Sequence, residues 1–263
     1  MFDKKIIVIL FLGAGLFLTS FIPSQPSKDN KVDDAFSSKH SENVLNGMVV
    51  LELFTSQGCS SCPPADELLK VVKNKYPENT FVLSYHVDYW NYIGWADPFS
   101  NKDFTEKQSR YNKKFGYSGN YTPELVVNGK EHLVGSNNMK VINAIDKYSG
   151  IKSQNELSVQ QLNRSTNKID FDYKIDGDTV GKNVRAVLLL KERITEIKRG
   201  ENRQRTLVNT NIVIGEKYLK INDGRVVGSI NIPSLAINNE ELVLMLLVEN
   251  NDADITGGVK AAI

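Results

Sequence analysis

The chain has 263 residues, which is enough for one large domain or two small ones. Hydrophobic residues make up 41% and charged residues 24%, so the composition is that of a globular protein and excludes disordered, collagen-like and multi-span membrane proteins. The 32 Lys and Arg residues against 31 Asp and Glu residues leave a net charge of +1. No overall field attracts nucleic acid, and we expect no nucleic-acid partner.

The first 24 residues have the pattern of an export signal. Lys4 and Lys5 precede an uncharged stretch over residues 6–22, which is slightly shorter than the about 20 residues of a membrane-spanning helix. We expect residues 1–24 to be a signal peptide or an uncleaved anchor, which would be the only attachment to a membrane. Residues 25–46 are rich in Ser, Asp, Lys and Asn and are predicted to be a polar linker. The expected location is the periplasm or the cell envelope.

Residues 47–150 alternate between strand and helix patterns. Apolar runs predict strands, and apolar residues spaced by three and four positions predict amphipathic helices. In chain order the predicted elements are a strand, a helix, a strand, a helix, a strand and a closing helix over residues 48–54, 65–76, 81–87, 104–115, 124–127 and 141–148. Because a helix joins the first two strands, they should lie parallel in an α/β sheet. Asn128 and Gly129 form a strong two-residue hairpin signal.

The pattern changes beyond Gly150, where apolar residues alternate with polar ones. The predicted strands cover residues 169–175, 184–190, 207–214, 225–232 and 241–248. No strong helical segment separates them. We therefore predict an all-β antiparallel sandwich domain over residues 151–263, following the α/β domain.

Cys59 and Cys62 are the only cysteines, and they lie in the turn between the first predicted strand and the first predicted helix. The positive end of a helix dipole stabilises a thiolate, and the thiol pKa in such turns falls from about 8.5 to between about 3.5 and 7.5. Pro63 and Pro64 fit without cost only in the first helical turn, so the helix should begin at about Ser60 or Ser61. This should leave Cys59 at the exposed lip of the turn and Cys62 inside it.

Three interpretations of this pair stay open. The first is thiol-disulfide exchange, in which Cys59 attacks a substrate disulfide and Cys62 resolves the mixed disulfide, with no cofactor. The second is a non-catalytic binding module in which the disulfide only staples the turn. The third is a copper-handling protein that uses the two thiolates with a histidine, His86 or His132.

Five separated motifs resemble a known family. They are VLELFTSQGCSSCPPAD over residues 50–66, HVDYW over 86–90, GW followed by DPF over 94–99, YTP over 121–123, and RGENR over 199–203 with TN at 210–211. This set is similar to an exported bacterial family catalogued as domain of unknown function 1223, and the order of the elements resembles the thioredoxin fold. The resemblance implies an α/β thioredoxin-like domain over residues 47–150. The resemblance indicates the fold more strongly than it indicates a substrate.

The resemblance to thioredoxin-like proteins also implies roles for residues near the cysteines. Pro123 matches the cis-proline that faces the CxxC turn, and Thr122 would present its backbone to an extended substrate. Glu52 is the candidate for the buried acid that accepts the proton of the resolving cysteine. Its separation from Cys59 is one residue longer than the common thioredoxin spacing, and a shift of one residue turns a strand side chain to the other face.

Trp90 and Trp95 lie in an aromatic-rich stretch over residues 85–99. Such a stretch packs a core or an interface, or it forms an apolar groove beside the cysteines that recognises polypeptide. The two tryptophans are therefore candidate substrate-binding residues. In the same stretch His86 and Asp88 share one strand face and could form a hydrogen-bonded pair.

Four cations within residues 198–205 predict a solvated turn, or else a site for a phosphate or an acidic partner. No glycine-rich nucleotide loop or nucleophile elbow is present in the sequence. The predicted function is therefore an exported thiol-disulfide oxidoreductase that acts through Cys59 and Cys62. Its expected partners are exported proteins with thiols or disulfides, together with a redox partner that the sequence does not identify.

Overall fold

The computed structural model of the protein describes residues 47–221, 226–236 and 240–263. The predicted signal or anchor over residues 1–24 and the linker over residues 25–46 lie outside the described residues. Within the described ranges, none of the helices combines the length and the apolar character that a membrane crossing requires.

Strands outnumber helices along the described chain. In order the elements are β1 (Val49–Thr55), α2 (Pro63–Lys75), β2 (Thr80–His86), the 3-10 helix η1 (Asn91–Ile93), α3 (Lys102–Lys114), β3 (Glu124–Val127), β4 (Glu131–Val134), α4 (Asn138–Ser149), β5 (Glu156–Arg164), β6 (Lys168–Asp176), β7 (Lys182–Glu196), β8 (Thr206–Lys220), β9 (Val226–Asn231), β10 (Leu242–Asn250) and β11 (Ile255–Ala262). The elements predicted from periodicity are present, and β4 completes the predicted hairpin. The elements η1, β5 and β11 are additional.

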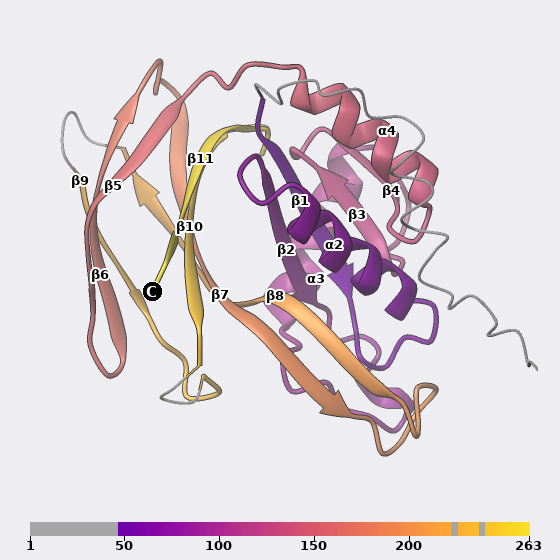
Figure 1. Ribbon diagram of the computed structural model, residues 1–263. Helices are drawn as coiled ribbons and strands as arrows, with labels where there is room; N and C mark the ends of the chain where they lie inside the picture. The colour runs from indigo at the N-terminus through magenta and orange to yellow at the C-terminus, as the bar shows by residue number, and fades with distance from the viewer. Residues whose placement is uncertain (1–46, 222–225, 237–239) are drawn as a thin grey trace, which may run out of the picture.

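Eight strands form one mixed sheet in the order β11-β10-β7-β8-β2-β1-β3-β4 (Figure 1). β1 and β2 are parallel neighbours joined by α2, as predicted, and β3 pairs antiparallel with β1. β8 pairs with β7 along most of its length and also with β2, where Ile212 lies opposite Ser84. This contact continues the sheet from the first half of the chain into the second half.

The predicted fold class is wrong. The chain is not an α/β thioredoxin-like domain followed by a separate all-β antiparallel sandwich domain. It is mostly β, and only β5, β6 and β9 leave the large sheet to form a second, three-stranded sheet. The physical reason is visible in β7, where residues 184–190 are all buried. A strand buried on both faces needs a packing partner on each side, which a two-layer sandwich does not provide.

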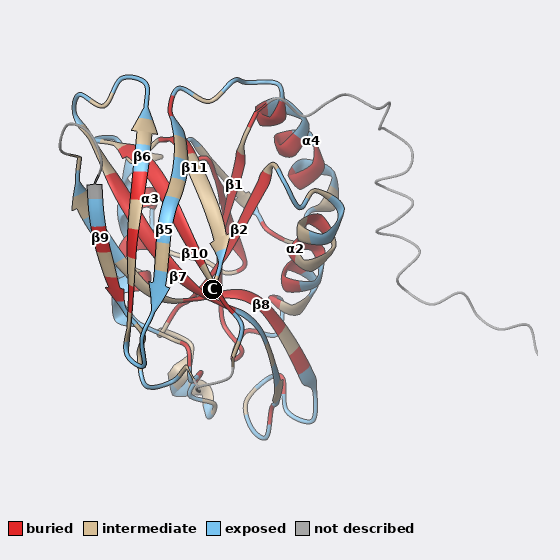
Figure 2. Cartoon of the chain, turned by 60° about the vertical axis from the view of Figure 1, so that its left-hand side comes forward, coloured by how far each residue is buried: buried red, intermediate tan, exposed pale blue. Residues whose placement is uncertain are grey.

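The two faces of β7 and β10 pack in two different cores. One face, with Leu188, packs against Phe171 of the three-stranded sheet. The other face, with Val187, packs against Phe54 of β1 and against β2 and α3. A further core lies between β1 to β3 and the helices α2 and α4, whose buried sides face the sheet in Figure 2. The second half of the chain thus completes the core of the first half.

A buried ion network lies in the core that the two halves share. Fully buried Arg185 donates to Glu52 at 2.7 Å and to Glu216 at 3.2 Å, and its Nε lies 3.2 Å from Glu249. Lys107 lies 3.1 Å from Glu216. Burial by itself raises the pKa of Glu52, but Arg185 and Lys107 outweigh it and hold that pKa below its ordinary value. The ionised network connects β1, α3, β7, β8 and β10.

The turn between β3 and β4 has the conformation that its sequence predicts. Asn128 and Gly129 have φ values of 49° and 69°, as a type I′ turn requires. The carbonyl of Asn128 accepts a 3.0 Å hydrogen bond from the N–H of Ile255 at the start of β11. The hairpin of the first half is therefore tied to the last strand of the chain.

Candidate redox site

The two cysteines form a disulfide at the amino end of α2, with an S–S distance of 2.15 Å. Pro63 and Pro64 take the first helical turn as predicted, but Cys62 occupies the N-cap position and α2 begins at Pro63, later than the predicted start at Ser60 or Ser61. Because proline has no N–H, this helix end presents fewer free donors than the prediction assumed. The predicted stabilisation of a thiolate therefore rests on the helix dipole, which the two prolines leave unchanged.

Both cysteines are fully buried. The expectation that Cys59 lies exposed at the lip of the turn is therefore wrong. The two residues between the cysteines, Ser60 and Ser61, are exposed instead. The Oγ of Ser61 lies 3.4 Å from the Sγ of Cys59 and donates to the carbonyl of Thr122, also at 3.4 Å.

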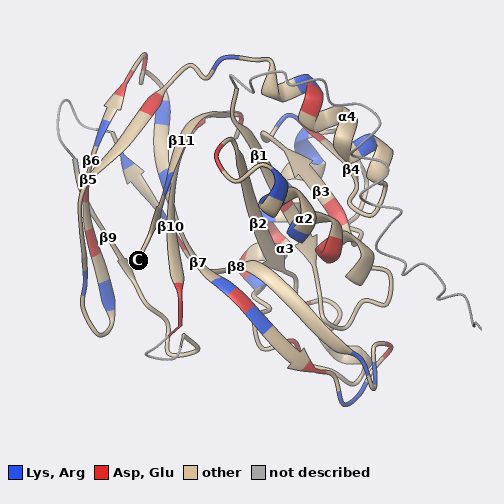
Figure 3. Cartoon of the chain, in the orientation of Figure 1, with Lys and Arg blue, Asp and Glu red and all other residues tan. Residues whose placement is uncertain are grey.

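The tip of the β7–β8 hairpin covers Cys59. Fully buried Asn202 donates from Nδ2 to the carbonyl oxygens of Gln57, at 2.9 Å, and Cys59, at 2.8 Å. The carboxylate of Glu201 accepts the N–H of Ser60 at 3.1 Å. Lys and Arg gather around this tip in Figure 3, and they are exposed, as a solvated turn predicts. Sequence reasoning noted these cations and missed Asn202, which the RGENR motif contains.

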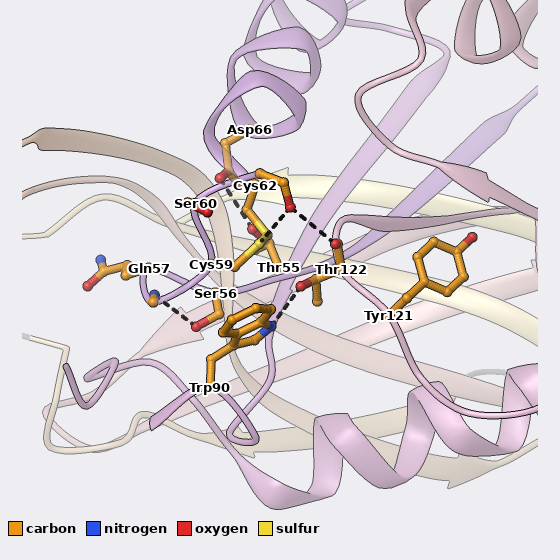
Figure 4. Close-up of a disulfide and its surroundings, with 12 residues drawn as sticks. Thr55, Ser56, Gln57, Cys59, Ser60, Cys62, Asp66, Trp90, Tyr121 and Thr122 are labelled. Atoms are coloured by element: carbon orange, nitrogen blue, oxygen red, sulfur yellow. Dashed lines mark hydrogen bonds between the residues drawn. A yellow bond between two sulfur atoms is a disulfide. The ribbon is translucent and has the colours of Figure 1, made fainter. Parts of the chain in front are cut away.

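Trp90 and Thr122 lie beside the disulfide (Figure 4). The indole N–H of Trp90 donates to Oγ1 of Thr122 at 2.7 Å. A Cβ on Gly58, next to Cys59, would lie 3.2 Å from the Cβ of Trp90, so the Trp90 side chain packs closely against the CxxC loop. The Thr122–Pro123 peptide bond is cis, as the resemblance implied. The structure thus brings Trp90 and the residue before the cis-proline together at the cysteines.

Trp95 has a different position from Trp90. Its indole N–H donates to Oε1 of Gln57 at 3.1 Å, and its Cβ would lie 3.2 Å from a Cβ on Gly200 of the hairpin tip. The amide nitrogen of Gln57 in turn donates to Thr195 and to Asn209, each at 3.1 Å. Trp95 therefore packs between the CxxC loop and the hairpin that covers it.

Glu52 lies away from the cysteines. Phe54, two residues along β1, packs in the core that faces α3, whereas Leu53 packs toward α2. Because strand side chains alternate, Glu52 also faces α3, where Arg185 and the hydroxyl of Tyr111, at 2.7 Å, hold it. The structure does not bring this acid to the disulfide.

A different buried acid lies beside Cys62. Asp66 is one helical turn further along α2, and side chains on a helix lean back toward its amino end. Its Oδ2 accepts a hydrogen bond of 3.2 Å from Thr55, and Figure 4 shows this pair next to the disulfide. Burial raises the pKa of Asp66 to about 7, against the lowering effect of His86. Sequence reasoning missed this residue, although the regular i, i+4 spacing from Cys62 could have identified it.

His86 and Asp97 form a buried pair below the CxxC loop. The Nδ1 of His86 lies 2.7 Å from Asp97, which also accepts the N–H of Gln57 at 2.7 Å. The predicted pairing of His86 with Asp88 is wrong, because Asp88 binds the hydroxyl of Thr105 instead. Burial lowers the pKa of His86, but Asp97 outweighs burial and leaves it raised. Asp97 thus links the end of β2 to the CxxC loop.

The described residues give no support to copper binding. Within them, no group of three His, Cys, Asp or Glu side chains is placed to hold a metal ion. His86 is engaged with Asp97, and His132 lies 3.1 Å from Glu124 and stacks on Phe115.

Comparisons with known proteins identify one family and solved structures of similar fold. The model of a family described as "Protein of unknown function (DUF1223)" matches residues 50–249. The crystal structure of protein AGR_C_4864 from Agrobacterium tumefaciens is 29% identical, with a TM-score of 0.61 over 84% of this chain and 95% of that one. HBP35 of Porphyromonas gingivalis is 17% identical over 83% of this chain and 76% of its own, with a TM-score of 0.56, and is similar in fold alone. None of the curated proteins matches the chain.

Proposed function

The chain belongs to the DUF1223 family of proteins of unknown function, and from its site we propose that it is a thiol-disulfide oxidoreductase acting on other exported proteins. The observation that carries the proposal is the position of the Cys59–Cys62 disulfide, at the start of α2 and beside the exposed residues Ser60 and Ser61 and the Thr122 carbonyl. Export to the periplasm or cell envelope is part of the proposal and rests on the sequence pattern of residues 1–24.

The chemistry requires two thiol-exchange steps. In the reduced protein, the Cys59 thiolate attacks one sulfur of a substrate disulfide, and the other substrate sulfur leaves as a thiolate that takes up a proton. Cys62 then loses its proton and attacks the Sγ of Cys59, which releases the second substrate thiolate. One substrate disulfide is reduced while the Cys59–Cys62 bond forms. The reverse sequence oxidises a substrate dithiol.

Asp66 is suited to accept the proton that Cys62 releases. The carboxyl group is buried next to Cys62, and its Oδ1 has no hydrogen-bond partner among the described residues. A pKa of about 7 lies near neutral pH, where an acid can both take up and return a proton. Substrate access also requires the hairpin tip to move, because Asn202 and Glu201 bind the backbone of Cys59 and Ser60 and so hold the tip against the CxxC turn.

The reduction potential of the purified protein tests the proposal. A potential between about −270 and −120 mV is expected of a working exchange site, whereas a value below about −300 mV is typical of a structural disulfide and would contradict it. The Cys62→Ser variant should accumulate mixed disulfides with substrate proteins. The matched Cys59→Ser variant should form none.

The full burial of both cysteines favours one second candidate, a binding module in which the disulfide only staples the turn. In that case both serine variants lower the unfolding temperature by similar amounts and neither captures a partner through a disulfide. The same pair of variants therefore separates the two functions.

A further inference from the structure

A cavity of about 500 Å³ lies at the opposite end of α2 from the disulfide. This volume is within the range of small-molecule sites, which often lie where two parts of a fold meet. The cavity is formed where the end of α2 and the start of β2 meet β8, β10 and β11. Its lining includes an apolar side made by Pro77, Val243, Met245, Ala261 and Ala262. The polar side is made by Lys73, Thr80, Lys191, Asn211 and Lys260, together with Asn74.

Besides the exposed Lys191, two half-buried lysines, Lys73 and Lys260, line this cavity. The ammonium group of Lys260 donates to the carbonyl oxygens of Thr80, at 3.0 Å, and Pro77. That of Lys73 donates to the carbonyl of Lys191 at 3.4 Å. Each ammonium has three N–H donors. On these contacts, both lysines keep a donor for a ligand.

The neighbouring charges do not neutralise Lys73. Lys70 forms an ion pair with Glu192 at 3.3 Å, and Lys191 pairs with Glu241. Glu192 and Glu241 also attract Lys73, but each forms its ion pair with another lysine.

Both cavity lysines are held in an environment that disfavours their charge. The pKa of Lys73 is lowered, first by burial and then by Lys191, with Lys70 and Lys260 adding to the effect and Glu192 opposing it. Burial also lowers the pKa of Lys260, against the nearby acid Glu78. A bound anion would relieve this repulsion.

Two residues of the cavity lining each carry a buried polar atom that has no hydrogen-bond partner among the described residues. These atoms are Oγ1 of Thr80 and Oδ1 of Asn211, and their residues are 3% and 4% exposed. Asn211 has a φ of 50° and donates from Nδ2 to the carbonyl of Val82 at 2.8 Å, which fixes the orientation of its amide. Buried polar groups in proteins are nearly always hydrogen-bonded. Of the two, only the hydroxyl of Thr80 can donate to an anion, since the amide oxygen of Asn211 can only accept.

We propose that this cavity binds a small carboxylic acid with an apolar body. The carboxylate lies between the ammonium groups of Lys73 and Lys260 and accepts a hydrogen bond from the hydroxyl of Thr80. The apolar body lies against Val243 and Met245. An inorganic anion would use only the polar half of the site, and a neutral alcohol only the apolar half.

Titration calorimetry of decanoate into the oxidised protein tests this proposal. One molecule should bind per chain. The double variant Lys73→Met, Lys260→Met keeps the length of both side chains and should weaken binding by about tenfold or more, because charge-assisted hydrogen bonds are lost. Thr80→Val, which keeps the side-chain shape, should weaken it more modestly. The control Lys70→Met, at a lysine outside the cavity lining, should bind decanoate as the wild type does.

Further measurements keep the result interpretable. Thermal unfolding of each variant shows whether it is folded. If the double variant is unfolded, the binding result for Thr80→Val decides the test. Decanol and inorganic phosphate should each bind more weakly than decanoate. The proposal is overturned if decanoate does not bind, if both the double variant and Thr80→Val bind it unchanged, or if decanol or phosphate binds as tightly.

Discussion

Asn202, at the tip of the β7–β8 hairpin, donates a hydrogen bond of 2.8 Å to the carbonyl oxygen of Cys59, which lies 143 residues earlier in the chain. Through this contact the second half of the protein covers the disulfide that the first half carries. The two halves therefore share the candidate site as well as the large sheet. Access to the disulfide depends on how firmly the hairpin tip is held.

Removal of the Asn202 amide should loosen this cover. Asn202→Ala leaves two buried carbonyl oxygens without their donor and should cost about 1 to 3 kcal/mol of stability. The disulfide of the folded variant should then react faster with dithiothreitol than that of the wild type. The control Arg203→Ala changes an exposed side chain on the same tip and should leave the rate unchanged. Equal rates in all three proteins would show that the tip does not limit access.

Asp66 should make the stability of the oxidised protein depend on pH. Its pKa is about 7 in the folded state and about 3.9 in an unfolded chain, so the folded state holds a proton that the unfolded state has lost. The free energy of unfolding should therefore fall as the pH rises from about 4 to about 7.

The Asp66→Asn variant should lack that fall and should be more stable than the wild type at pH 8, by roughly 1 to 4 kcal/mol. Asn retains an oxygen that can accept the hydrogen bond from Thr55. Urea unfolding at pH 5 and pH 8 measures the difference. Parallel pH profiles for the two proteins would contradict the raised pKa.

Arg185 should be one of the most sensitive positions in the core. Arg185→Met leaves Glu52, Glu216 and Glu249 without their central cation and should cost about 3 to 5 kcal/mol, because an uncompensated buried charge is strongly destabilising. In contrast, Lys174→Met removes an exposed pair with Asp176 and should cost no more than about 1 kcal/mol. Chemical denaturation measures both. Similar costs would mean that the buried network contributes little.

Alanine substitutions at two glycines should distinguish the cost of backbone strain from the cost of steric overlap. Gly129 and Gly116 have nearly equal φ values of 69° and 67°, and a Cβ costs about 1 to 2 kcal/mol in this left-handed region. A Cβ on Gly129 would lie 1.9 Å from the backbone oxygen of Ala253, whereas nothing lies within 4 Å of one on Gly116. Gly129→Ala should therefore lower the unfolding temperature clearly more than Gly116→Ala. Equal shifts would mean that the turn at Gly129 can move away from Ala253 at no cost in stability.

Local patterns predicted most elements of the chain because they depend on near neighbours in the sequence. The predicted strand over residues 124–127 matches β3, and α2 starts with its two prolines. β11 was missed because Gly257 and Gly258 weaken its strand pattern. The structure explains one of these glycines, since a Cβ on Gly257 would lie 2.3 Å from the carbonyl oxygen of Asn155. That requirement comes from the close approach of the segment before β5 to β11, which local sequence does not reveal.

The sequence by itself determined the family resemblance, the CxxC pair at the start of a helix, and the hairpin at Asn128 and Gly129. Only the tertiary structure decided that β8 pairs with β2, that Asn202 covers Cys59, and that Asp66 lies beside Cys62. The physical reason is that hydrophobic periodicity indicates which side chains are buried, but not which surface covers them. The packing partners of β7 come from both halves of the chain, and so do the residues around the disulfide.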